Sequence, residues 1–192
     1  MTMNKLKMLF ANLLGLLLGV KEKHDADLGT VSRIMVVRQH NQIGDMIVSL
    51  PLFKALKERY PDAEVTLIAS RENFKAVEKN PLVDHLFVFD KHKLFSPGYL
   101  NEICHVLKIH YDLVIVPSVT SISLTTNFIA RLANGRIRIG PKSLQGEPNP
   151  TACFFHKRID LDWRRNDKTH AAQRNLDIVK PFGITTSDLA PF

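Results

Sequence analysis

The residue with the clearest chemical meaning is Asp45, which follows Gly44 in a polar loop after a short apolar segment. That segment, residues 34–37, fits a strand buried on both faces, as in a parallel sheet. In open α/β sheets, ligands bind beyond the carboxyl ends of the strands. A carboxylate at this position can accept a proton from a reacting hydroxyl group. Asp45 therefore lies where chemistry is expected, and a helix-capping carboxylate is the alternative interpretation of this residue.

Three neighbours of Asp45 in the same loop could contribute to a binding site. Gly44 lets a ligand approach the backbone closely, because it has no side chain. His40 and Asn41 carry hydrogen-bonding groups that suit a hydroxylated ligand. An exposed loop residue without a role is the alternative for His40.

Two basic residues, Arg71 and Lys75, follow the second predicted strand, residues 65–69. Parallel strands end at the same edge of a sheet, so we expect both side chains near the edge that carries Asp45. Cations there could bind acidic groups of a ligand. Pairing with carboxylates on the protein surface is the alternative for both.

Apolar segments and turn signals alternate along the rest of the globular part. The helix after Asp45 either begins near that residue and kinks at Pro51, or begins at a Ser49 cap. The other predicted elements are helix 71–79, strand 86–89, helix 97–108, strand 113–116, helix 121–132, strand 136–139, a long loop 140–154 and a helix from Thr169 to Lys180. Strands alternating with helices predict an α/β fold, a Rossmann-like doubly wound parallel sheet.

The net charge of +7 is concentrated in the last third of the chain. Residues 131–180 hold eleven Lys/Arg and five Asp/Glu. Such a region suits phosphates, acidic sugars or anionic lipid, and an ordinary solvated surface is the alternative. Nucleic acid is not an expected partner, because aromatic residues are not interleaved with the basic ones. No metal is expected, since the carboxylate cluster that holds Mg²⁺ is absent from the sequence pattern.

Residues 1–28 differ in composition from the domain predicted over residues 29–192. Lys5 and Lys7 precede an apolar segment, residues 8–20, whose helical length of about 20 Å is shorter than the roughly 30 Å hydrocarbon core. No small-x-small cleavage site follows it. We predict a helix on the membrane surface, followed by a linker. A helix packed on the protein itself and a targeting signal are the alternatives.

Several short motifs occur together in a fixed order. They are Arg38, Gly44-Asp45, Pro51, Arg59-Tyr60-Pro61-Asp62-Ala63, Asn80-Pro81-x-Val83-Asp84, Ala130-Arg131, Arg138-Ile139-Gly140 and His170-Ala-x-x-Arg174. In this pattern the chain resembles the heptosyltransferase family, inverting GT-B glycosyltransferases that act on lipopolysaccharide core. The resemblance covers roughly residues 30–185.

The resemblance implies transfer of a sugar from a nucleotide-sugar, with ADP-heptose as the expected donor, to a lipid-linked glycan, with no cofactor or metal. It implies Asp45 as the base. The implied acceptor contacts are Gly44, His40, Asn41, Arg71, Lys75, Arg138, His170 and Arg174. For His170 and Arg174, a structural role in the first turn of a helix is the alternative. The family also implies a cytoplasmic enzyme, peripheral on the inner face of the cytoplasmic membrane.

GT-B enzymes have two Rossmann-like domains, and the second binds most of the nucleotide-sugar. The sequence therefore corresponds to the N-terminal, acceptor-side half, with the donor-binding domain absent or separate. Two other functions stay open. The chain could be a non-catalytic module that binds an anionic glycan, or an unrelated nucleotide-binding Rossmann domain.

Overall fold

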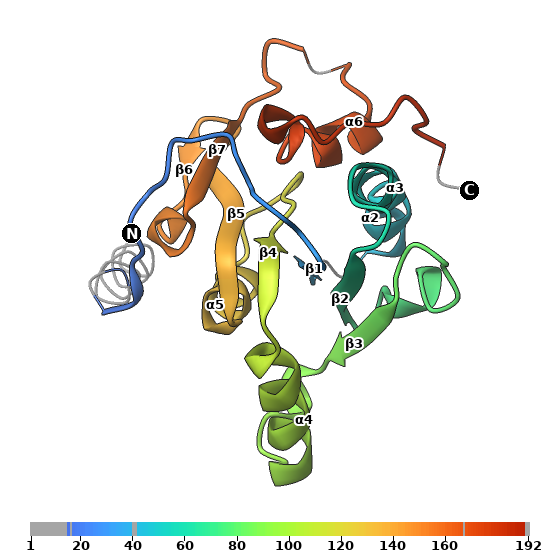
Figure 1. Ribbon diagram of the computed structural model, residues 1–192, viewed down its shortest axis with the longest axis vertical. Helices are drawn as coiled ribbons and strands as arrows, with labels where there is room; N and C mark the ends of the chain where they lie inside the picture. The colour runs from blue at the N-terminus through green and yellow to red at the C-terminus, as the bar shows by residue number, and fades with distance from the viewer. Residues whose placement is uncertain (1–14, 16, 40–41, 167, 191–192) are drawn as a thin grey trace.

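An open, mostly parallel sheet forms the centre of the computed structural model, which describes residues 15, 17–39, 42–166 and 168–190 (Figure 1). The strand order is β3-β2-β1-β4-β5-β6, and β7 also pairs with β5. Among the described pairings, β5 with β6 is antiparallel and the others are parallel. The strands are β1 Arg33–Arg38, β2 Glu64–Ser70, β3 His85–Phe89, β4 Tyr111–Ile115, β5 Gly135–Leu144, β6 Glu147–Pro148 and β7 Lys157–Leu161. The predicted α/β fold is confirmed.

Helices cover both faces of the sheet, with α2, α3 and α6 on one side and α4 and α5 on the other (Figure 1). The α-helices are α2 Ile43–Ile47, α3 Leu50–Arg59, α4 Pro97–Lys108, α5 Leu124–Leu132 and α6 Ala171–Leu176. Four 3-10 turns of the described chain are η1 Phe74–Ala76, η2 Lys91–Lys93, η3 Ala152–Phe154 and η4 Lys180–Phe182.

The buried strand β1 divides the apolar core into two halves. Ile34 and Val36 pack into the core on the side of α3 and α6. Met35 and Val37 pack into the other core, beside α4 and α5. Successive side chains of a strand point to opposite faces, so a continuous apolar segment is what a two-sided sheet requires.

The helical region after β1 is broken in two. The first helix, α2, contains Asp45, and α3 begins after Ser49 with Pro51 in its first turn. Ser49 donates its hydroxyl to the carbonyl oxygen of Met46 at 2.6 Å instead of capping α3 with its side chain. Each of the two alternatives therefore describes one half of the structure.

The predicted helix over residues 71–79 is wrong in extent, since the segment holds turns and the short η1. Asn73 explains the difference. Its buried side chain accepts a hydrogen bond from the Ser70 backbone N–H at 2.9 Å and donates to the Arg38 carbonyl oxygen at 3.4 Å. A polar side chain that bonds nearby backbone groups competes with helix formation.

The predicted loop over residues 140–154 is also wrong, because β5 continues to Leu144 and pairs with β7, a strand that the sequence pattern did not indicate. A register shift between Pro141 and Ser143 accommodates the proline, which has no N–H to donate to the ladder. Asn149 supports the turn by donating its side-chain amide to the Pro141 carbonyl oxygen at 2.6 Å. The last predicted helix is shorter than expected, since α6 ends at Leu176.

The described part of the N-terminal segment lies against the domain. Leu17 and Leu18 are helical, and residues 19–28 then cross the edge of the sheet beside β7 (Figure 1). Val20 N donates to Cys153 O at 2.8 Å, and Lys23 N donates to His156 O at 2.7 Å. Residues 1–14 and 16 of the predicted membrane-surface helix lie outside the described residues. In the part of the chain that is described, no helix combines the length and apolar character needed to cross a bilayer.

The close packing of β5 against Phe155 predicts that a methyl group added at Gly140 lowers stability. A Cβ at Gly140 would overlap the ring of Phe155, which is fully buried. We expect Gly140→Ala to lower the free energy of unfolding by about 1–3 kcal/mol, measured by urea denaturation. Gly98→Ala is the matched control, because a Cβ there meets no atom within 4 Å. Equal stability of the two variants would contradict this packing.

His156 predicts a pH dependence of stability. Burial, and then the neighbouring cations led by Arg138, lower the pKa of His156 from 6.5 to about 4. The unfolded state therefore binds more protons between these values, so stability should fall as pH is lowered from about 6.5 toward 4. His156→Asn keeps an acceptor for the Arg138 N–H, which His156 Nδ1 accepts at 3.0 Å, but cannot titrate. Its urea midpoint should depend less on pH in this range, and an unchanged slope would contradict the assignment.

Candidate functional site at the carboxyl edge of the sheet

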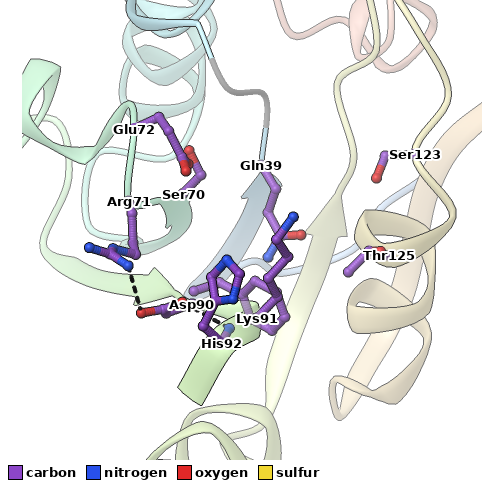
Figure 2. Close-up of a pocket in the computed structure, with 10 residues that line it drawn as sticks. Gln39, Ser70, Arg71, Glu72, Asp90, Lys91, His92, Ser123 and Thr125 are labelled. Atoms are coloured by element: carbon purple, nitrogen blue, oxygen red, sulfur yellow. Dashed lines mark hydrogen bonds and ion pairs between the residues drawn. The ribbon is translucent and has the colours of Figure 1, made fainter. Parts of the chain in front are cut away.

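A polar cleft of about 220 Å³ opens where the strand order reverses. From β1 the chain continues to β2 and β3 on one side, and β4 and β5 lie on the other side of β1. Such a switch point is where open α/β sheets bind ligands. The lining residues end or follow β1, β2 and β3, or lie at the start of α5. They are Gln39, Ser70, Arg71, Glu72, Phe89, Asp90, Lys91, His92, Ser123 and Thr125 (Figure 2).

Arg38 is buried at the switch point and contacts the chain on both sides of it. This last residue of β1 is 1% exposed. Its Nε and Nη2 atoms donate to the carbonyl oxygen of Asp45 at 3.2 and 2.8 Å, and Nη1 donates to the carbonyl oxygen of Pro117 at 3.4 Å. Pro117 follows β4, so one guanidinium holds the segments after two neighbouring strands.

The charge of Arg38 also matters to the site. Burial lowers the pKa of Arg38 to about 10, and the negative charge of Asp45 opposes that shift. A guanidinium with this pKa is still protonated near neutral pH. Its positive charge therefore favours a negative charge at the edge of the sheet above it.

Asp45 itself lies where its sequence position predicts, in the first turn of α2 beyond the end of β1. The residue is half-buried, and Gly44 beside it is exposed, with open space where a Cβ would stand. The N-terminal end of a helix favours a carboxylate. Asp45 is not one of the residues that line the 220 Å³ cleft, so a substrate reaching both must extend along the edge of the sheet.

Arg71 is the predicted contact that the structure places in the cleft wall (Figure 2). Its Nη1 atom lies 3.4 Å from Oδ2 of Asp90, while its side chain stays 60% exposed. Asp90 is buried and also accepts a hydrogen bond from the His92 N–H at 2.9 Å. The ion pair orients Arg71 and leaves several of its N–H groups facing solvent, so surface pairing and ligand binding are compatible.

Three other predicted contacts are not among the described residues that line the cleft. Lys75 is exposed in η1 and does not belong to the lining of the cleft. His40 and Asn41 lie outside the described residues. Their roles as acceptor contacts stay predictions.

Arg138 requires a correction. Its side chain is buried, and it donates from Nε to Ala130 O at 3.0 Å and from Nη2 to Ala133 O at 2.6 Å. Burial, with Arg131 nearby, lowers the pKa of Arg138 to about 10. The guanidinium therefore binds carbonyl groups at the C-terminal end of α5, where a cation is favoured. It has a structural role and is not retained as an acceptor contact.

His170 and Arg174 organise α6, which is the structural alternative. His170 Nδ1 accepts a hydrogen bond from Ala172 N at 3.2 Å as the helix cap. Arg174 donates from Nε to Thr169 O at 3.0 Å, and its guanidinium lies 5.3 Å from the centre of the Trp163 ring. The helix also reaches the α2–α3 junction, since Asn175 donates its side-chain amide to Val48 O at 3.1 Å.

The sequence interpretation missed most of the polar residues of the cleft. Gln39 is the most informative, because its Nε2 atom is buried without a hydrogen-bond partner among the described residues. Ser123 and Thr125 contribute from the start of α5, where the Ser123 hydroxyl also accepts a hydrogen bond from Thr126 N at 3.3 Å. The available signal was position, since Gln39 directly follows β1 and Asp90 directly follows β3.

No group of three or more His, Cys, Asp or Glu side chains with metal-binding geometry occurs among the described residues. The expectation that neither metal nor cofactor takes part stays a prediction.

The α/β fold of the chain resembles that of solved glycosyltransferase structures. A glycosyl transferase family 9 structure from Veillonella parvula matches with a TM-score of 0.63 at 21% identity, covering 88% of this chain and 45% of that chain. The Escherichia coli heptosyltransferase WaaC, solved with ADP-2-deoxy-2-fluoro heptose, matches with a TM-score of 0.62 at 18% identity, covering 83% of this chain and 52% of that chain.

Sequence comparison gives the same relationship. Lipopolysaccharide heptosyltransferase 3 of Escherichia coli is 23% identical over 157 residues, which are 73% of this chain and 40% of the relative. No protein-family model matches the chain. Together, the sequence and structural matches show that the chain is related to the heptosyltransferase family. It spans about 40% of the length of the curated relatives it matches.

The central position of Arg38 predicts a large effect of a conservative change. Arg38→Lys keeps the charge but cannot reproduce the three donor contacts to two carbonyl groups. We expect the free energy of unfolding to fall by about 1.5–3 kcal/mol, measured by urea denaturation. Arg33→Lys at the other end of β1 is the control, since this half-exposed residue pairs with Glu64 on the surface and should change stability by about 0–1 kcal/mol. Similar losses in both variants would refute the anchoring role.

Proposed function

We propose that the chain is the acceptor-side part of a glycosyltransferase. It transfers a heptose-type sugar from a nucleotide-sugar, ADP-heptose, to a hydroxyl of a lipid-linked glycan in lipopolysaccharide core biosynthesis. The observation that carries this proposal is Asp45 held by Arg38 at the carboxyl edge of the sheet, in a chain related to heptosyltransferases. The structural match to a heptosyltransferase solved with an ADP-heptose analogue supports the donor class.

The proposed reaction inverts the anomeric carbon in one displacement. The acceptor hydroxyl oxygen forms a bond to the anomeric carbon while the bond to the departing nucleoside diphosphate breaks. The hydroxyl proton passes to the Asp45 carboxylate as the attacking oxygen becomes acidic. Because Arg38 fixes the backbone of Asp45 directly, the base is positioned before substrate binds, which reduces the entropic cost of in-line attack.

The cleft gives the proposal its acceptor site. Hydroxyl and amide groups of Gln39, Ser123 and Thr125 suit sugar hydroxyls, and the exposed guanidinium of Arg71 suits an acidic sugar. Gly44 permits close approach next to Asp45, and His40, Asn41 and Lys75 remain proposed contacts at the same edge. An acceptor that fills the cleft and extends to Asp45 would meet Gln39, Arg71, Ser123 and Thr125 on its way.

The donor site is proposed to lie mainly in a second domain. The matched structures are about twice as long as the part that this chain covers, with shares of 45% and 52%. Residues that complete the nucleotide-sugar site can belong to the same polypeptide or to a partner. A lipid-linked acceptor also implies work at the inner face of the cytoplasmic membrane, which we propose as the location.

Replacing the proposed base tests the chemistry. Asp45→Asn removes the proton acceptor at nearly constant size, so transfer from ADP-heptose to a core-glycan lipid should fall by about 100-fold or more. Acceptor affinity and thermal stability should change little. Asp62→Asn, in the exposed turn between α3 and β2, is the matched control and should retain full activity.

Turnover of Asp45→Asn near that of the unmodified chain would contradict its role as base. If the chain supplied with its donor-binding domain binds the acceptor saturably but transfers no sugar when ADP-heptose is present, the anionic-glycan binding module becomes the better description.

A further inference from the structure

The loop between β3 and α4 exposes an unusual combination of side chains beside the cleft. Phe95 is 96% exposed, the highest value among the large hydrophobic residues described. Lys91, His92 and Lys93 precede it in η2 and are exposed as well. Lys91 and His92 line the cleft (Figure 2). Residues 91–95, called the rim loop here, therefore begin in its wall and continue beside it.

Hydrogen bonds fix the shape of the rim loop. Asp90 accepts from His92 N through its side chain at 2.9 Å and from Lys93 N through its backbone at 3.1 Å. Ser96 N donates to Lys93 O at 2.9 Å, and the Tyr99 hydroxyl accepts from Asp90 N at 2.6 Å.

This fixed turn directs the side chains of Leu94 and Phe95 to opposite sides. Leu94 packs against the core on the side of α4, whereas Phe95 points to solvent. Contact between an exposed phenyl group and water is unfavourable, and a partner that covers the ring removes this cost. The rim loop therefore has the character of a contact surface.

We propose that the rim loop contacts an anionic lipid bilayer, with Phe95 inserted at the interface and Lys93 among the headgroups. Charge supports this partner, because the sequence from Lys91 to Asn101 has no acidic residue. The adjacent Asp90 is buried and paired with Arg71. An aromatic side chain flanked by cations matches a surface that is apolar inside and negative outside.

This contact goes beyond the proposed transfer reaction and gives its cleft an orientation. With the rim loop on the membrane, the wall formed by Lys91 and His92 faces the headgroup layer. A glycan still attached to its lipid could then enter the cleft without leaving the bilayer. The contact is a separate property from catalysis, and it can be measured without donor or acceptor.

Fluorescence tests the insertion at one residue. In Phe95→Trp, vesicles of phosphatidylethanolamine and phosphatidylglycerol should shift the added emission to the blue, and brominated acyl chains should quench it. The native Trp163 is buried and supplies a constant background that is subtracted. Lys79→Trp is the control, because this exposed residue precedes β3, toward the opposite edge of the sheet, and should show neither change.

Co-sedimentation of the full chain with the same vesicles tests the affinity. Phe95→Asp combined with Lys93→Glu should lower the partition coefficient by about tenfold or more, while Lys79→Glu should leave it near the original value. Vesicles of phosphatidylcholine alone should bind weakly. Unshifted, unquenched emission from the vesicle-bound Phe95→Trp variant, or equal binding by the double variant, would overturn the proposal. Either result would leave the proposed glycosyl transfer untouched.

Discussion

A buried guanidinium at the end of β1 is the constraint on which the site depends. A charge removed from water is costly unless its donors are satisfied, and Arg38 meets that requirement with the carbonyl oxygens of Asp45 and Pro117. Asn73 adds a third connection by bonding the carbonyl group of Arg38 and the N–H of Ser70. The ends of β1, β2 and β4 are thereby held together at the switch point.

The remainder of the fold supports this arrangement from outside. The helix α6 bonds the α2–α3 junction through Asn175, so the short helix that carries Asp45 is held at both ends. On the other face, Arg138 closes the C-terminal end of α5, whose first turn supplies Ser123 and Thr125 to the cleft. The buried arginines Arg38 and Arg138 thus have structural roles. In the proposed function, the exposed Arg71 binds the ligand.

The parts of the fold that the sequence predicted are those set by apolar periodicity. Buried segments such as residues 34–37 and 113–116 can hardly be anything but central strands once helices separate them. The placement of Asp45 followed from the same logic. The break between α2 and α3 and the turn at Asn73 depend on individual side-chain hydrogen bonds, which a periodic pattern does not contain.

The errors have related physical causes. Gly140 and Pro141 normally interrupt a strand. Here a register shift and the hydrogen bond from Asn149 to the Pro141 carbonyl oxygen allow β5 to continue through both residues. In the sequence, Arg138 and Arg71 are both simply cations. Arg138 is buried and Arg71 is exposed, and this difference, which decides their roles, arises only from tertiary packing. The sequence did not indicate that Phe95 is exposed, because an isolated phenylalanine is normally expected in the core.

The most direct measurement is a map of where an acidic core oligosaccharide binds. Amide resonances of the ¹⁵N-labelled chain would be followed during titration with the glycan. The account predicts saturable shifts for Asp45 and Gln39 together with Arg71 and Thr125, from three segments that meet only at the carboxyl edge of the sheet. Shifts confined to the opposite edge of the sheet, or to the basic region of residues 131–180, would contradict it.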